Sequence, residues 1–141
     1  MDFRIERSSW QEGRQDLERI RKEVFVQEQR VPEDMEWDGE DEASIHFLAR
    51  ADDGYPLGCI RLTPSGQISR LSVLESHRTQ GIGKALLVAA EEEARARGMK
   101  EISLHAQTHA TSFYEAAGFT VVGGTFLEAG IPHRQMAKEL A

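Results

Sequence analysis

Cysteine, proline and long apolar runs are all scarce in this sequence of 141 residues. The single cysteine, Cys59, cannot form a disulfide within the chain. The longest apolar run, around Leu86–Ala90, has five or six residues, against roughly 18 to 20 needed to cross a bilayer. The first residues lack the basic-then-apolar order of a secretory signal. These absences exclude a disulfide scaffold and a membrane span, and they predict a globular protein of the reducing cytoplasm.

The chain also lacks an excess of basic residues, with 17 Lys and Arg against 24 Asp and Glu and a net charge of -7. Nucleic acids and anionic lipids are bound by clustered Lys or Arg, so neither is a predicted partner. The imbalance lies in residues 33–42, which contain the acids Glu33, Asp34, Glu36, Asp38, Glu40, Asp41 and Glu42. We expect a solvated loop there. Two alternatives are attraction of a cationic partner such as an amine, and use of the loop in a protein interaction.

Apolar spacing and turn residues predict a mixed sheet with helices. Strands are expected near residues 3–5, 45–49, 57–62, 68–74, 101–106, 119–122 and 133–136, and helices near 17–25, 83–97 and 111–117. No repeat or linker divides the sequence, so residues 1–141 are expected to form a single domain. The pattern predicts an α/β (α+β) fold, with a mostly antiparallel central sheet of six to seven strands flanked by about four helices.

The most informative stretch is residues 78–84, Arg-Thr-Gln-Gly-Ile-Gly-Lys, between an expected strand and an expected helix. Its two glycines allow several main-chain N–H groups to meet an anion at the start of the helix. A simple connecting turn is the alternative. A Walker loop is excluded, because Arg78 and Ala85 stand where it needs Gly and Ser or Thr. A dinucleotide fingerprint is excluded by Leu86 at its third glycine.

The pattern that does match is Arg-x-x-Gly-x-Gly, which resembles the acyl-coenzyme A signature of the GNAT superfamily of N-acetyltransferases. Residues 112–119, Ser-Phe-Tyr-Glu-Ala-Ala-Gly-Phe, resemble the second signature of that superfamily. Residues 24–29, 105–107 and 130–133 are similar to the YjcF/ElaA-like branch of its bacterial members. The resemblance covers nearly the whole chain. It implies a GNAT-like fold and acetyl-CoA as co-substrate.

The resemblance also implies where acetyl-CoA binds. The strand before the loop would pair with the pantetheine arm as an added strand does. The pyrophosphate would lie on the amides of the loop, with charged contacts from its flanking residues. Gln107 could hold the cofactor or be an ordinary polar residue at a strand end. The expected cofactor-binding residues are Leu71, Ser72, Val73, Arg78, Thr79, Gln80, Gly81, Ile82, Gly83, Lys84, Gln107 and Phe113.

Acetyl transfer to an amine needs a proton donor for the departing thiolate and an acceptor for the proton of the amine. By resemblance the donor is Tyr114, whose ordinary pKa of about 10 keeps it protonated at neutral pH; simple aromatic packing is the alternative. Some relatives carry a catalytic glutamate on the strand before the loop, whereas residues 69–72 here contain no carboxylate. The candidate bases are Glu28 and His105, with His46 and His133 as further candidates.

We therefore predict an acetyl-CoA-dependent N-acetyltransferase that acetylates a primary amine, in a small molecule or a peptide, by direct attack in a ternary complex. No metal is expected, because the five His and one Cys are scattered. Cys59 lies on an apolar strand, which disfavours an acetyl-cysteine route. A non-catalytic acyl-CoA-binding module and an interaction domain using residues 33–42 are the alternative functions. A homodimer is an open expectation, since no interface is specified.

Overall fold

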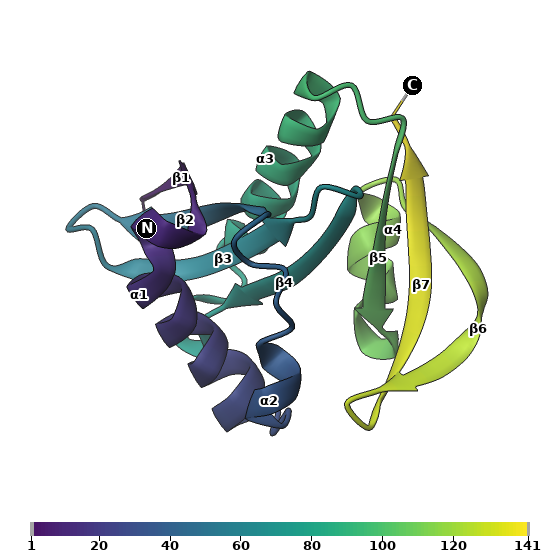
Figure 1. The fold of residues 1–141 in the computed structure, drawn as a ribbon, viewed down its shortest axis with the longest axis horizontal. Coiled ribbons are helices and arrows are strands. Elements are labelled where there is room, and N and C mark those ends of the chain that lie inside the picture. The colour runs from purple at the N-terminus through teal and green to yellow at the C-terminus, as the bar shows by residue number, and fades with distance from the viewer. Residues whose placement is uncertain (1, 141) are drawn as a thin grey trace.

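Residues 2–140, which the computed structural model describes, form a seven-stranded sheet in the order β1-β2-β3-β4-β5-β7-β6 (Figure 1). Neighbouring strands are antiparallel except β4 and β5, which are parallel. The predicted mixed, mostly antiparallel sheet is thus confirmed. The strands are β1 (Phe3–Ser8), β2 (Ile45–Ala51), β3 (Pro56–Leu62), β4 (Gln67–Val73), β5 (Glu101–Gln107), β6 (Thr120–Glu128) and β7 (Ile131–Glu139).

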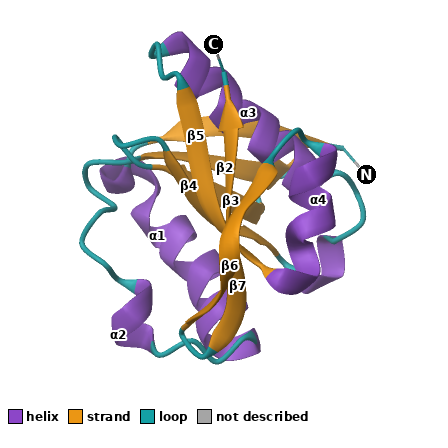
Figure 2. Cartoon of the chain, turned by 90° about the vertical axis from the view of Figure 1, so that its right-hand side faces the viewer, coloured by secondary structure: helices purple, strands orange, loops and turns teal. Residues whose placement is uncertain are grey.

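Helices cover both faces of the sheet (Figure 2). One face carries α1 (Trp10–Arg21), a π-helix (Lys22–Glu28) and the short α2 (Glu33–Glu36). The other face carries α3 (Ile82–Ala96) and α4 (Thr111–Ala116), preceded by the 3-10 turns Glu75–His77 and Thr108–Ala110. None of the helices formed by residues 2–140 is long and apolar enough to span a lipid bilayer.

The first helix begins at a side-chain cap and changes its winding before it ends. Ser9 Oγ accepts the N–H of Glu12 at 3.1 Å, which satisfies a free donor of the first turn. Leu17 and Ile20 are buried against the sheet, as their spacing predicts. The expected helix through Val24 and Phe25 exists, but from Lys22 onward it is a π-helix, which the apolar spacing did not indicate.

The helix α3 closely follows its prediction. Its buried face is formed by Leu86, Leu87, Ala90 and Ala94, which pack on the sheet core. The helix stops before Gly98, which has a φ of +76° and so adopts the left-handed conformation common after helix ends.

The acidic segment 33–42 is only partly the solvated loop that its composition predicts: five of its seven acids are exposed, but Glu36 and Asp41 are buried. It begins with α2 and then folds inward, so that three of its acids form ion pairs with three arginines from α1, β3 and β4. The six charged residues of this buried-charge cluster are Glu36, Asp38, Asp41, Arg21, Arg61 and Arg70. The burial of two acids was not expected because the compensating arginines lie far away in the sequence.

Asp41 is the centre of the buried-charge cluster. Its Oδ1 accepts from Nη1 of Arg21 at 2.6 Å and from Nη1 of Arg61 at 3.1 Å. The two arginines are 0% and 1% exposed. Burial by itself would raise the pKa of Asp41, but the hydrogen bonds and charges of the two guanidiniums outweigh it and hold that pKa below its usual value.

This cluster predicts a loss of stability in acid. The pKa values of Asp38 and Asp41 are both lowered in the folded protein, against the pull of burial, by their arginine partners. Between about pH 5 and the lower folded values, the unfolded chain therefore binds more protons than the native one, so the free energy of unfolding falls as the pH falls. Urea titrations at pH 7, 5, 4 and 3 should show this decrease. In Asp38→Asn the free energy of unfolding should fall less steeply with decreasing pH than in the wild type. An equal dependence on pH in the two proteins would contradict the prediction.

Candidate active site

The strands β4 and β5 separate to open the middle of the sheet (Figure 1). They pair at only two positions, Gln67 with Ser103 and Ile68 with Leu104. Beyond these, β5 continues to pair with β7 along its whole length, whereas β4 turns away. The edge of residues 71–73 that faces β5 is therefore open to an extended ligand.

A bulge in β4 accompanies this separation. The register between β3 and β4 shifts between Cys59 and Arg61, and Arg70 has a φ of +58°. The Arg70 side chain is held by the buried-charge cluster, with Nε 2.9 Å from Glu36 Oε2 and Nη2 3.2 Å from Asp38 Oδ2. The folded acidic segment thus fixes the bend that opens the sheet.

The start of α3 presents main-chain donors at the same end of the sheet. Gly81, with a φ of +84°, precedes the helix, and no side chain among residues 2–140 caps it. The amides of Ile82, Gly83 and Lys84 therefore lack intrahelical partners and carry the positive end of the helix dipole. A Cβ placed at Gly83 would lie 3.7 Å from the Phe113 ring, so Phe113 borders this loop.

Arg78 is directed at protein groups. Its Nη1 and Nη2 each donate to the Glu28 carboxylate at 2.7 Å, and its Nε donates to the carbonyl of Val73 at 2.9 Å. The pair joins the end of the π-helix to the end of β4. The hydrogen bond from Arg78, opposed by burial, lowers the pKa of Glu28, so this carboxylate is a weak proton acceptor at neutral pH.

A cavity of about 870 Å³ passes through the opening between β4 and β5. It brings together ten of the residues selected from the sequence: Glu28, Leu71, Ser72, Val73, Arg78, Gly83, His105, Gln107, Tyr114 and His133. The other selected residues are outside its lining: Thr79, Gln80, Gly81, Ile82, Lys84, Phe113 and His46. The Ile82 side chain is buried in the core, which leaves its amide as the group that could meet an anion.

Tyr114 lies in the cavity wall, where α4 faces the opening. Its ring packs edge-on against Phe113 and Phe119, with centroids 5.0 and 6.0 Å away. Burial raises the pKa of Tyr114 to about 12. The phenol is therefore protonated throughout the neutral range and can act as a proton donor.

The histidines differ in their access to the cavity. His105 and His133 line it, from β5 and β7. His46 is 1% exposed, its Nε2 lies 3.0 Å from the carbonyl of Asp41, and burial lowers its pKa. His46 is therefore held beside the buried-charge cluster and is not part of the cavity lining.

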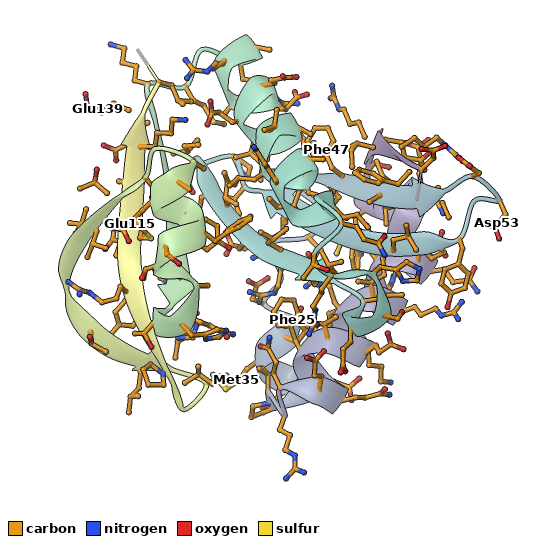
Figure 3. The ribbon with its side chains drawn as sticks, turned by 180° about the vertical axis from the view of Figure 1, so that it is seen from behind. Phe25, Met35, Phe47, Asp53, Glu115 and Glu139 are labelled. Atoms are coloured by element: carbon orange, nitrogen blue, oxygen red, sulfur yellow. The ribbon has the colours of Figure 1, made fainter. Side chains whose placement is uncertain are left out.

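Several residues that sequence reasoning missed also line the cavity. Gln29 Oε1 accepts from Gln107 Nε2 at 2.8 Å, which ties the π-helix to β5 across the opening. Phe25 and Met35, both labelled in Figure 3, line the cavity on the side of the π-helix and α2, and Glu128 lines it from β6. Gln29 lay in one of the branch-specific stretches, whereas Glu128 had no signal in the sequence.

An opened mixed sheet followed by an uncapped helix start is the architecture of the GNAT fold. The chain belongs to the GNAT acetyltransferase family: the sequence profile described as "Acetyltransferase (GNAT) domain" matches residues 11–140. This confirms the family resemblance and the predicted fold class.

Individual relatives agree with this assignment. The chain is 40% identical over 124 residues to the uncharacterized N-acetyltransferase YjcF of Bacillus subtilis, covering 85% of this chain and 88% of the relative. The crystal structure of Escherichia coli ElaA superimposes with a TM-score of 0.87 at 27% identity, covering 98% and 100% of the two chains. An acyl-CoA N-acyltransferase from Pseudomonas aeruginosa gives 0.86 at 29%, covering 97% and 99%. The similarity to the YjcF/ElaA-like branch is thereby confirmed.

Proposed function

We propose that this protein is an acetyl-CoA-dependent N-acetyltransferase that acetylates a primary amine of a small molecule or a peptide. The observation that carries the proposal is the single cavity on which the open edge of β4 and the Tyr114 side chain converge, with the start of α3 reaching it at Gly83. An extended thioester with a charged diphosphate requires these features along one path. The name of the Pseudomonas aeruginosa neighbour, an acyl-CoA N-acyltransferase, supports the same class of co-substrate.

Each part of the cavity has a chemical task in this proposal. Acetyl-CoA supplies the activated acetyl group when it is bound. The amides of residues 79–84 bind its diphosphate, and the main chain of residues 71–73 orients its pantetheine arm. A main-chain N–H of the same segment stabilises the negative charge that develops on the carbonyl oxygen. Tyr114 donates a proton to the leaving sulfur.

Direct attack by the amine fits the surroundings of the one cysteine. Cys59 is 1% exposed, and burial raises the pKa of its thiol to about 11, although a hydrogen bond with Ser72 opposes this. A buried thiol that remains protonated is a poor nucleophile. The acetyl group therefore passes to the amine without an acetyl-cysteine intermediate.

A charge placed at the start of α3 tests the diphosphate site. Gly83→Glu should weaken the binding of acetyl-CoA by at least about tenfold in a calorimetric titration, because a carboxylate there repels the diphosphate. A Cβ at this position meets only ordinary contacts, and an acid at a helix start stabilises the helix, so the melting temperature should not fall.

Gly124→Glu is the matched control, since it adds the same charge to β6 where a Cβ would meet nothing within 4 Å. Its affinity for acetyl-CoA should equal that of the wild type. Thiol release with a panel of amines, polyamines and peptides then tests catalysis. Binding without turnover would indicate a non-catalytic acyl-CoA-binding module, and no binding at all would leave an interaction domain.

A further inference from the structure

A carboxylate and two imidazoles meet at the cavity wall formed by the last three strands. His105 Nδ1 on β5 lies 2.9 Å from Glu128 Oε1 at the end of β6. His133 Nε2 on β7 lies 3.7 Å from Glu128 Oε2. The Phe126 ring packs edge-on against His105 at 5.0 Å and stacks on His133 at 6.0 Å. We call these four residues the His–Glu cluster.

The strand register explains why the cluster faces the cavity. On β7, His133 is paired with Gln107 of β5 on one side and with Phe126 of β6 on the other, so these three side chains share a face. His105 and Glu128 are two residues from Gln107 and Phe126 and share that face as well. The alternate positions point into the core instead: Leu104, Ala106 and Met136.

The hydrogen-bond partners assign the proton of each imidazole. An ionised carboxylate only accepts, so His105 Nδ1 carries a hydrogen and donates it to Glu128. In neutral His105 the lone pair is therefore on Nε2, which has no hydrogen-bond partner among residues 2–140. The Nδ1 of His133 donates to the carbonyl of Ile131 at 2.7 Å, which fixes that ring.

Three other carboxylates that line the cavity are occupied. Glu28 forms two hydrogen bonds with Arg78, and Glu36 and Asp38 are paired with arginines of the buried-charge cluster. Glu128 differs from them, because among the ion pairs of residues 2–140 its partners are imidazoles only. A cationic ammonium group of a substrate is thus attracted to the carboxylate beside His105.

We infer that His105 is the general base of the transfer and that Glu128 is the positioning residue that orients its ring; this inference rests on the proposed function. The substrate ammonium gives one proton to His105 Nε2, which releases it to solvent. The neutral amine attacks the thioester carbon, the C–S bond breaks, and the sulfur takes the proton of Tyr114. The second proton of the attacking nitrogen restores the Tyr114 phenol. The products are the amide, the free thiol and one proton.

Replacing His105 should reduce kcat by a factor that depends on pH. His105→Gln should reduce kcat by on the order of 100-fold at pH 7, with the affinity for acetyl-CoA unchanged in a calorimetric titration. The deficit should shrink as the pH rises toward the pKa of the amine, because more of the amine then arrives neutral. Imidazole added to His105→Ala should restore part of the activity. A merely structural role would give neither the changing deficit nor the rescue.

Variants of two other acids serve as comparisons for the pH profile of His105→Gln. Glu128→Gln should reduce kcat by about tenfold, since a neutral amide binds His105 Nδ1 less strongly than the carboxylate and orients the ring less well. Glu139→Gln, on the exposed end of β7, should leave kcat unchanged. The remaining titratable groups of the cavity are His109, Tyr114, Glu40, and the paired Glu28, Glu36, Asp38, Arg61, Arg70 and Arg78.

The outcomes separate this inference from the proposed function. The assignment of the base alone is overturned if the wild type turns over an amine and His105→Gln has the same kcat. It is also overturned if the loss of kcat in His105→Gln does not vary with pH. A large loss in His133→Gln with none in His105→Gln overturns it as well. No turnover of any amine by the wild type overturns the proposed function and the base with it. Thermal unfolding of each variant shows whether it is folded before its kinetics are compared.

Discussion

Replacing Asp41 with alanine should lower the free energy of unfolding by about 3 to 5 kcal/mol, the usual cost of removing one partner from a buried ion pair. Asp41 accepts hydrogen bonds from both Arg21 and Arg61, which are almost completely buried. Without the carboxylate, two guanidiniums remain in the interior with less compensating charge. Urea titration of the wild type and the variant at pH 7 measures the difference.

Two further variants separate the charge of Asp41 from its shape. Asp41→Asn keeps the volume of the side chain but removes the negative charge, so most of the loss should remain. Glu42→Ala changes the neighbouring, exposed acid of the same segment and should alter stability by no more than about 0.5 kcal/mol. A loss in Asp41→Ala that equals the small loss in Glu42→Ala would show that the buried-charge cluster is not a stabilising element.

This cluster also marks a limit of sequence reasoning. Seven acids in ten residues indicate a solvated loop, because sequence shows only local charge. Arg21 and Arg61 lie twenty residues on either side of Asp41, and nothing near the acids in the sequence signals that a helix and a strand will bring these arginines together. Long-range ion pairs are a property of the tertiary fold.

Elements with local signals were predicted well. The hairpins between β2, β3 and β4 follow from alternating apolar residues and the turn glycines Gly54 and Gly66, both of which have a φ of +90°. The buried face of α3 follows from its helical spacing. The π-helix was not predictable in this way, because its hydrogen bonds shift by one residue while its apolar side chains still follow a helical pattern.

In the candidate site, too, residues with a local sequence signal were predicted and long-range contacts were not. The loop of residues 78–84 and Tyr114 were found because each lies in a contiguous signature. The partner of His105 was not found, since Glu128 is 23 residues away and reaches it only through the order β5-β7-β6. Arg78 was expected to contact an anion, and only the structure gives its guanidinium another partner, Glu28.

Removing the Tyr114 hydroxyl should produce the largest change in catalysis. Tyr114→Phe should reduce kcat by about 100-fold to 1,000-fold, within the range for a positioned proton donor. The aromatic ring remains, so its packing on Phe113 and Phe119 and the shape of the cavity wall are preserved. The affinity for acetyl-CoA and the KM for the amine should therefore change little. Steady-state thiol release at pH 7 and a calorimetric titration measure the two effects separately.

Tyr55→Phe is the matched control, because the chain has only 2 tyrosines and the second is 42% exposed near the β2–β3 turn, where its hydroxyl accepts from Arg19. It should have the kcat of the wild type. Because the pKa of Tyr114 is raised to about 12, its donor form persists across the neutral and mildly alkaline range, so the deficit of Tyr114→Phe should be constant between pH 7 and pH 9. This constancy distinguishes the acid from the base, whose loss becomes smaller as the pH rises. A Tyr114→Phe variant with the turnover of the wild type would remove the phenol from the reaction and leave it a packing residue.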